Sequence, residues 1–304
     1  MEHSLEQLEN CPSCGEKKLN SHLSCTDYTY SKSTFNLVKC ASCSLVFTNP
    51  RPDEKSIGAF YDNPEYVSHT DTQEGLLFRL YAVVKSYTLG RKRALLNSFG
   101  TSKSLLDYGA GSGDFSNEMQ SSGWTVTSYE PDSNARSSIS KKNPEIQLID
   151  SIESLPDDSK SVIALWHVLE HVHQLRNTLD QFNRILSPEG RLIIAVPNHL
   201  SYDAQFYDNE WAAYDVPRHL YHFDQSSMET LLGKSGFRLV KTKPMWFDSF
   251  YVSLLSEKNI GNTGGLSIFI GWGRAFLVGI VSNLKALGST KKCSSITYIF
   301  EKVN

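Results

Sequence analysis

Residues Leu105 to Phe115 read LLDYGAGSGDF, and a second apolar stretch, 124–129, ends in Glu130 of the segment VTSYEPD. An apolar run that ends in an acid and is followed by three glycines at every second position predicts a buried strand turning sharply into a helix. Glycine lets the backbone lie close against a ligand. Glu130 stands where an α/β sheet places a carboxylate beside a ribose, and that carboxylate can accept hydrogen bonds from the ribose hydroxyls. The sequence therefore predicts a nucleoside-binding loop.

The glycine spacing indicates which nucleoside binds. Dinucleotide folds use G-x-G-x-x-G to bring a pyrophosphate to a helix N-terminus, whereas this loop has G-x-G-x-G. Asp107 precedes the first glycine and Asp114 follows the third, and two carboxylates suit a cationic ligand better than a pyrophosphate. S-adenosylmethionine fits, because it carries an ammonium and a sulfonium but no phosphate.

The motifs DYGAGSGDF and YEPD resemble the first two motifs of class I S-adenosylmethionine-dependent methyltransferases. The likeness continues in three segments that resemble the family's fourth strand, fifth strand and final helix–strand unit: ALWHVLEHV (164–172), LSPEGRLIIAVPN (186–198) and LLGKSGFRLV (231–240). It covers about half of the chain and is nearest to the quinone-biosynthesis and natural-product branch. The resemblance implies an α/β fold with a Rossmann-like doubly wound sheet, and a ligand at the carboxyl ends of its strands.

The resemblance also implies where the cofactor lies. Asp150 and Ser151 follow the third apolar run, where the family holds the adenine; a plain surface loop is the alternative. His167 ends the fourth strand and is expected beside the cofactor. The full set expected to bind S-adenosylmethionine is Asp107, Gly109, Gly111, Gly113, Asp114, Phe115, Glu130, Asp150, Ser151 and His167.

Four of the six cysteines form two C-x2-C pairs, and they are Cys11, Cys14, Cys40 and Cys43. Two such knuckles complete a tetrahedral four-thiolate zinc site, so we predict a structural zinc ribbon over 1–50. A redox dithiol or four reduced structural cysteines are the alternatives. A closed four-thiolate site has no open position, which argues against catalytic zinc. We expect Cys25 and Cys293 to be free thiols, and 45–52 to be a linker because it contains two prolines.

The remaining chain is expected to form a helical lid or linker over 51–98 and the methyltransferase domain over 99–304. Apolar spacing predicts a helix from Glu74 to about Phe99. Tyr61 or Tyr66 before it is expected either to contact the methionine end of the cofactor or to pack locally. The segment 294–303 alternates in character and predicts a C-terminal antiparallel edge strand.

The size and charge of the chain restrict the kinds of substrate and partner that it can bind. A chain of 304 residues with 40% hydrophobic content can bury one large core and a small appended unit. The net charge is -3, the pI is near 6.3 and no basic run exceeds three residues, so we expect no nucleic-acid substrate. The N-terminus shows no secretory signal, which predicts a cytoplasmic protein without disulfides.

The segment from Leu266 to Leu284 is nearly continuous in apolar residues. Gly271, Arg274 and Gly279 interrupt it, and its length is at the lower limit for a membrane span. We expect a buried helix or one that forms a homodimer. Peripheral contact with a membrane or lipid is the alternative.

Methyl transfer from a sulfonium needs alignment more than covalent catalysis, but a hydroxyl acceptor needs a base, and histidine suits neutral pH. The catalytic candidates are His219, His167 and His171. His219 lies in an aromatic-rich insertion after the fifth strand, where the resembling family places its acceptor pocket. The pattern H-x-x-E-H at 167–171 also matches inverted zinc peptidases, though it follows a strand-like run. Some quinone-pathway enzymes bind a divalent cation at a similar patch, but there an acid stands in place of His167.

The sequence thus predicts S-adenosylmethionine-dependent methyl transfer to a small molecule. A hydroxyl acceptor, lipid-linked or glycan-related, is the leading version, and transfer to carbon or nitrogen stays open. A non-catalytic module that binds cofactor or protein, and a zinc-ribbon RNA methyltransferase, are the competing hypotheses.

Overall fold

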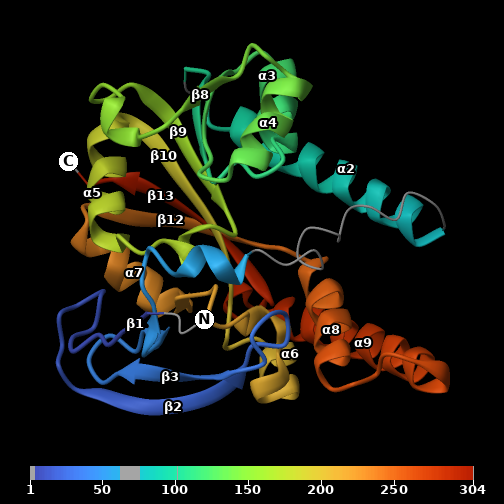
Figure 1. The fold of residues 1–304 in the computed structure, drawn as a ribbon. Coiled ribbons are helices and arrows are strands. Elements are labelled where there is room, and N and C mark those ends of the chain that lie inside the picture. Colours follow the sequence, from blue (N-terminus) through green and yellow to red (C-terminus); the bar gives the residue numbers. More distant parts are fainter. Residues whose placement is uncertain (1–3, 62–75, 101, 304) are drawn as a thin grey trace.

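The computed structural model describes residues 4–61, 76–100 and 102–303 (Figure 1). A seven-stranded sheet has the order β12-β13-β10-β9-β6-β7-β8. Its strands are β6 (Ser104–Tyr108), β7 (Thr125–Tyr129), β8 (Gln147–Ile149), β9 (Lys160–Trp166), β10 (Leu186–Pro197), β12 (Phe237–Pro244) and β13 (Ser295–Lys302). The five strands from β10 to β8 are parallel, whereas β13 is antiparallel to both of its neighbours. The predicted α/β fold with an antiparallel last strand is confirmed.

One detail of that prediction is wrong, because β13 does not lie at the edge. It pairs with β10 on one side and β12 on the other, so β12 forms the edge instead. All six residues from Ser295 to Phe300 are buried, as expected for a strand covered on both sides. Alternation in a short segment reports only that the segment is a strand, whereas its position in the sheet depends on distant partners.

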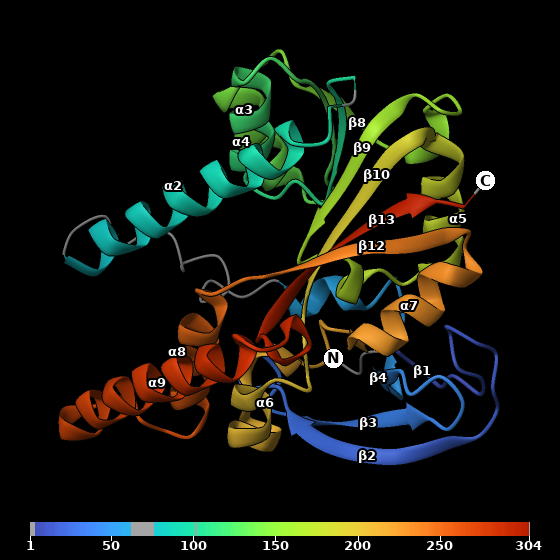
Figure 2. The same ribbon diagram turned by 180° about the vertical axis from the view of Figure 1, so that it is seen from behind.

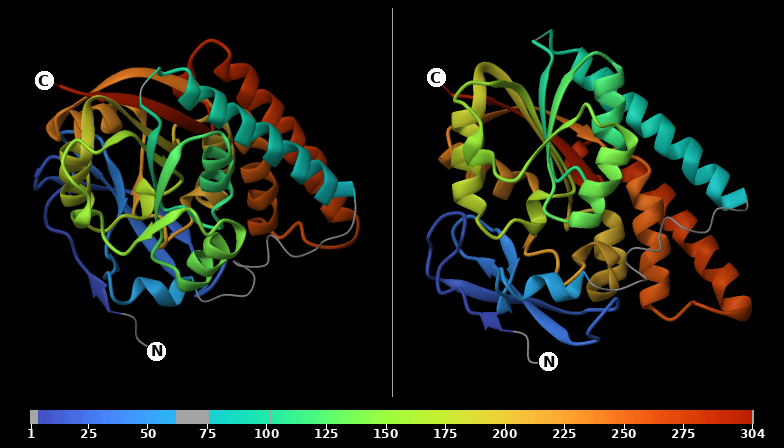
Figure 3. Two further views of the ribbon diagram at one scale, coloured as in Figure 1. Left: turned by 90° about the horizontal axis from the view of Figure 1, so that it is seen from above. Right: turned by 45° about the horizontal axis from the view of Figure 1, so that its top comes forward.

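Both faces of the sheet are covered by helices. Leu105 packs in a cluster with α3 (Asp114–Ser121) and α4 (Ser133–Lys142), and Leu106 packs in another with α5 (Leu175–Ile185) and α7 (Gln225–Lys234). Successive residues of a strand point to opposite faces, so continuous apolar runs such as 192–196 are needed where both faces are buried. Figure 3 shows the sheet between these two layers.

The cysteine-bearing N-terminal unit contains a hairpin between its two C-x2-C pairs, formed by β2 (Leu19–Thr26) and β3 (Thr34–Cys40). The segment 45–52 is not a linker, contrary to our prediction. It forms β4 (Val46–Thr48) and β5 (Arg51–Pro52), all buried, and β5 pairs with β1 (Leu5–Glu6). Strand β4 pairs with β11 (Tyr221–His222), giving a four-stranded sheet of order β11-β4-β3-β2. Residues 174 and 176 positions apart therefore pair in one sheet.

Three helices extend beyond this body. They are α2 (Leu76–Asn97), in agreement with the predicted helix, and an antiparallel pair of α8 (Asp248–Asn259) and α9 (Gly265–Ala286). All of them project from the same side (Figures 1 and 2). Within the described residues, α9 is the one helix that is long and apolar enough to cross a membrane. The remaining elements of the described residues are short: η1 (Ile57–Phe60), η3 (Ile152–Ser154), η4 (Leu169–His171), α6 (Tyr202–Tyr207), η5 (Asp208–Glu210), η6 (Ala212–Tyr214) and η7 (Thr290–Lys292).

Candidate functional site

The glycine loop joins β6 to α3 at the carboxyl edge of the sheet. Its three glycines all have positive φ, at 76° for Gly109, 54° for Gly111 and 76° for Gly113. A Cβ on Gly109 would lie 2.5 Å from a methyl of Val168, and one on Gly113 would lie 2.6 Å from Ile139. A Cβ on Gly111 would have nothing within 4 Å. The first and third glycines thus permit close packing, and the second borders open space in which a ligand can approach the backbone.

Glu130 follows β7 directly and ties the loop to that strand. Its carboxylate accepts hydrogen bonds from the backbone N–H of Gly111 at 2.7 Å and from that of Asp132 at 2.9 Å, and the residue is 8% exposed. A carboxylate has about four acceptor sites, so two remain for further donors. The side chain is therefore fixed beside the loop with acceptor capacity left for the two hydroxyls of a ribose.

Asp107, at the end of β6, is buried and accepts a hydrogen bond from Ser116. Burial raises its pKa to about 6. Lys92 of α2 is a neighbouring cation that the sequence did not single out: its Nζ lies 4.1 Å from the centroid of the Trp166 ring. Trp166 also packs edge-to-face on Phe115 at 5.4 Å between centroids. Acids and aromatic faces around a cation provide the chemistry that a sulfonium requires.

Three other residues predicted to bind cofactor make structural contacts. Asp114 pairs with Lys85 at 2.6 Å and Lys142 at 2.8 Å, and these lysines outweigh burial and lower its pKa to about 2. Asp150 is 95% exposed at its side chain and pairs with Arg136 at 2.7 Å. The Ser151 hydroxyl accepts the Glu153 N–H and caps η3. Cofactor contacts by these residues remain predictions.

His167 follows β9 and has a left-handed backbone with φ 58°. Its Nε2 lies 3.2 Å from an oxygen of Asp248, and its Nδ1 lies 3.6 Å from an oxygen of Glu170. Burial disfavours the imidazolium, but the two carboxylates outweigh burial and raise the pKa of His167 to about 9. This histidine is therefore protonated at neutral pH and poorly suited to accept a proton.

Glu170, His171 and His219 form a second cluster beside it. Each offers a ligand atom within 4.8 Å of the others, and the two imidazole rings are edge-to-face with centroids 4.6 Å apart. Glu170 is 1% exposed, and neither of its oxygens has a hydrogen-bond partner among the described residues. Such a group of ligands fits a divalent cation. The sequence pattern had grouped His167 with Glu170 and His171, whereas in the structure His219 is the third member. Without a cation, the same three groups form a proton-accepting network.

The tautomers follow from two backbone carbonyls. His219 Nδ1 lies 2.8 Å from the carbonyl oxygen of Ala213, and His171 Nδ1 lies 3.0 Å from that of Arg218. A carbonyl only accepts, so it favours a proton on Nδ1 and a lone pair on Nε2. Burial and the nearby His219 lower the pKa of His171 to about 4. Tyr61 lies beside this cluster, its hydroxyl 2.9 Å from His171 Nδ1, while Tyr66 lies outside the described residues.

Arg218 holds the predicted acceptor insertion against the N-terminal unit. It is 1% exposed, pairs with Asp215 at 2.6 Å and reaches Asp27 at 3.1 Å. Its contact with Asp27 spans 191 positions in the sequence and gave no local signal. The two units therefore meet directly behind His219.

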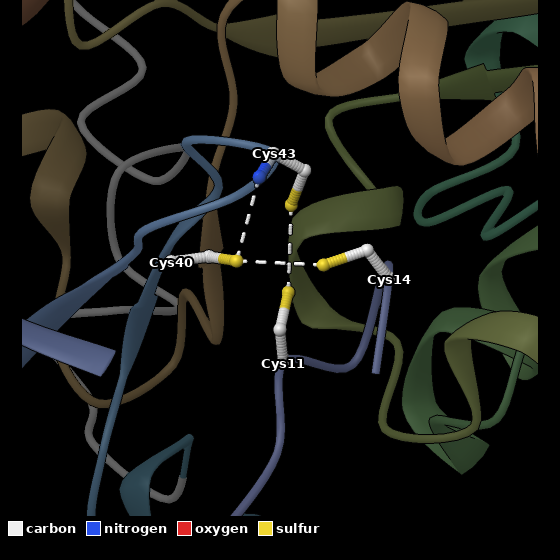
Figure 4. Close-up of side chains that lie close together, drawn as sticks. All are labelled: Cys11, Cys14, Cys40 and Cys43. Atoms are coloured by element: carbon white, nitrogen blue, oxygen red, sulfur yellow. Dashed lines mark hydrogen bonds between the residues drawn. The ribbon is translucent and has the colours of Figure 1, made fainter. Parts of the chain in front are cut away.

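The four cysteines converge (Figure 4). The sulfurs of Cys11 and Cys43 are 3.5 Å apart, and those of Cys14 and Cys40 are 3.4 Å apart. A tetrahedron with Zn–S bonds of about 2.3 Å has edges of about 3.8 Å, close to these separations. The predicted cluster is confirmed, and its four sulfurs fit a structural zinc ion. Cys25 and Cys293 are buried free thiols, as predicted.

Comparison with known proteins agrees with this geometry. The methyltransferase domain family matches residues 84–242, just over half of the chain. The magnesium protoporphyrin IX methyltransferase of Synechocystis PCC 6803, solved with bound SAH, is 14% identical with a TM-score of 0.53, covering 82% of this chain and 100% of that one. A putative sarcosine dimethylglycine methyltransferase from Galdieria sulphuraria is 13% identical with a TM-score of 0.50, covering 78% and 91% respectively. A comparison with curated proteins gave no match.

Proposed function

The chain belongs to the methyltransferase domain family and is an S-adenosylmethionine-dependent methyltransferase, and we propose that it methylates a hydroxyl oxygen of a small molecule. The single observation that supports an oxygen acceptor is the buried cluster of Glu170, His171 and His219. Transfer to a nucleophilic carbon or an unprotonated amine has less need of a buried base. A lipid-linked or glycan-related acceptor is the version we favour.

The bound cofactor would supply a methyl group activated by the sulfonium. The acceptor oxygen would bond to that methyl carbon as the carbon–sulfur bond broke, with the electron pair left on sulfur. The hydroxyl proton passes to the Nε2 lone pair of His219. Glu130 and the glycine loop orient the donor, and alignment provides most of the rate.

His219 is a better base than its neighbours. His167 is already protonated at neutral pH, and His171 has a pKa of about 4, which makes it a weak proton acceptor. Burial raises the pKa of Glu170, but the surrounding histidines outweigh burial and hold that pKa below its usual value, so this carboxylate stays ionised. A buried anion near His219 stabilises the imidazolium that forms during transfer.

The experiment measures transfer of labelled methyl groups to a panel of hydroxylated small molecules, including lipid-linked and glycan acceptors, with wild type and His219→Gln. We expect the variant to bind S-adenosylmethionine normally but to lose about 10²- to 10⁴-fold in kcat, as is typical for removal of a general base. His173→Gln is the matched control, because His173 hydrogen-bonds to the Pro52 carbonyl instead. Unchanged kcat in His219→Gln contradicts the proposal.

A further inference from the structure

The strongest feature outside the site is the outer surface of α9. The residues of this helix that face the protein are small or weakly polar, and they are Gly271, Ala275, Val278, Gly279, Ser282 and Ala286. Six of its large apolar side chains point to solvent with exposures between 59% and 76%, and they are Leu266, Phe269, Ile270, Phe276, Leu277 and Leu284. This is the reverse of the usual pattern of a surface helix, whose apolar stripe faces the core. The predicted buried helix is wrong, because only 28% of the most apolar stretch of α9 is buried, whereas the alternative of a helix that forms a homodimer stays a prediction.

The inner face of α9 packs mainly on α8, and it also contacts α6, where Ser282 donates a hydrogen bond to Asp203. A Cβ on Gly279 would lie 2.5 Å from the ring of Phe250, so this glycine permits the close approach of the two helices. Arg274 donates two hydrogen bonds of 2.7 Å to Glu257, which also accepts the Tyr207 hydroxyl at 2.8 Å. The α8–α9 pair is therefore a fixed hairpin that presents its apolar side outward. A lone transmembrane span would have to give up these contacts.

The exposed apolar area continues onto neighbouring elements. Tyr251 and Leu254 of α8 are 48% and 38% exposed, and Val83 of α2 is 66% exposed. Tyr87 of α2 packs edge-to-face on Phe247 at 5.7 Å between centroids, which connects the middle of α2 to the start of α8. We call α2 and the α8–α9 hairpin together the apolar wing. A patch of this size marks a binding surface.

The charge of the wing indicates the kind of surface that it meets. Helix α2 has five basic residues and no acidic ones, and 248–286 has three basic and two acidic ones. Eight positive minus two negative charges give +6, whereas the whole chain carries -3, so the rest carries -9. Both acids, Asp248 and Glu257, are paired within the protein, with His167 and Arg274. Lys85 and Arg93 pair with acids of α3, which offsets two of the positive charges, and the remaining balance of the wing is still positive.

More basic residues gather where the wing joins the sheet. Lys243, on edge strand β12, lies close enough to Lys241 and Arg91 that their repulsion adds to burial in lowering its pKa. Lys291 and Lys292 follow α9 in η7, which β12 contacts through a hydrogen bond between Thr242 and Thr290. An apolar helix face with basic residues beside it fits the surface of an anionic bilayer, where apolar side chains reach the acyl boundary and basic side chains meet phosphate head groups.

We propose that the apolar wing docks this enzyme peripherally on an anionic lipid bilayer, with the outer face of α9 at the boundary between head groups and acyl chains. The apolar face adds burial, and the basic residues add attraction to the anionic surface. A second copy of the chain is the competing occupant, but a self-complementary contact would bring two positive wings together. The docking does not depend on the proposed reaction at oxygen.

The test is flotation of the full-length protein with vesicles of phosphatidylcholine alone or with about one third phosphatidylglycerol. We expect flotation with the anionic vesicles, much less with the neutral ones, and release at high salt because charge attraction is screened. The double variant Phe269→Glu/Leu277→Glu should lose flotation completely. The matched control is Leu5→Glu/Val303→Glu, which changes two side chains of 50% and 58% exposure far from the wing and should float like wild type.

A second pair of variants tests the basic residues. Lys291→Gln/Lys292→Gln should weaken partitioning into anionic vesicles by about fivefold per lysine, since each contributes about 1 kcal/mol near such a surface. Thermal melting and binding of S-adenosylhomocysteine confirm that every variant is folded. Absence of flotation by folded wild type overturns the proposal. A wild-type dimer in analytical ultracentrifugation that becomes a monomer in Phe269→Glu/Leu277→Glu, without vesicle binding, would assign the surface to a second copy instead.

Discussion

Replacement of Glu130 by alanine tests the ribose contact. The carboxylate has two free acceptor sites in addition to the bonds to Gly111 and Asp132, which are 2.7 and 2.9 Å long. Hydrogen bonds to a charged group contribute about 1.5 to 3 kcal/mol each, but the ribose hydroxyls recover bonds to water in the variant. We therefore expect a net loss of about 1 to 3 kcal/mol, or roughly 5- to 150-fold in Kd. Loss of the two loop contacts favours the upper end of that range.

Calorimetry with S-adenosylhomocysteine measures this loss. Glu130→Gln keeps one acceptor oxygen and should show a smaller loss than Glu130→Ala. Asp150→Ala is the matched control for removal of a carboxylate, because that side chain is 95% exposed and should change affinity little unless it also binds the cofactor. A folded Glu130→Ala protein that binds within about twofold of wild type, a difference of about 0.4 kcal/mol, refutes the ribose assignment.

A ligand change separates the ribose contact from a general effect on the loop. Wild type should bind 5′-methylthioadenosine more tightly than its 2′-deoxy form, whereas Glu130→Ala should bind the two equally. If both proteins discriminate to the same extent, the carboxylate acts only through the loop. If the losses caused by Glu130→Ala and by removal of the 2′-hydroxyl do not add, the carboxylate and that hydroxyl are in direct contact.

Three further predictions concern charge and metal. Burial raises the pKa of Asp107 from 3.8 to about 6, so the folded protein loses stability as pH rises through that range. Between pH 4 and pH 6, the free energy of unfolding of Asp107→Asn, measured in urea, should therefore rise by about 3 kcal/mol relative to that of wild type. The same difference between variant and wild type at pH 4 and at pH 6 contradicts this. The pKa of His167 is raised from 6.5 to about 9, so the stability that it contributes is complete below pH 6.5 and lost as pH rises through 9, and the difference from His167→Gln should shrink over that interval; a constant difference would show that its charge is unimportant. Purified protein should contain about one zinc per chain by elemental analysis, lost in Cys43→Ser but kept in Cys25→Ser, and no zinc in wild type would reject the ribbon.

Much of the fold was predictable because its signals are local. The glycine loop, the strand before it and the acid after the next strand each depend on short-range backbone chemistry. The C-x2-C pairs likewise carry their geometry in their spacing, and the four sulfurs converge as expected.

The errors share a different cause, which is pairing between distant segments. Two prolines in 45–52 indicated a linker, but the segment is buried because it pairs with Tyr221 and His222 on one side and with Leu5 and Glu6 on the other. The position of β13 likewise depends on β10 and β12, far from it in the sequence. Local patterns do not record such partners.

The candidate site shows the same division. Glu130 was predictable from its place after a strand, whereas the convergence of His219 with Glu170 depends on the insertion folding back over η4. Lys92 gave no signal of its own in the sequence, although its Nζ lies over Trp166 within the site. The outward face of α9 could not be read from its composition, because a buried helix and a lipid-facing helix are equally apolar.

The most direct test of the central claim is calorimetric titration of the purified protein with S-adenosylmethionine, S-adenosylhomocysteine and NADH. We predict micromolar binding of the first two ligands and none of NADH, because the loop has G-x-G-x-G spacing and two carboxylates where a pyrophosphate would have to lie. Binding of NADH alone, or of none of the three by folded protein, would contradict the assignment of this chain as an S-adenosylmethionine-dependent methyltransferase.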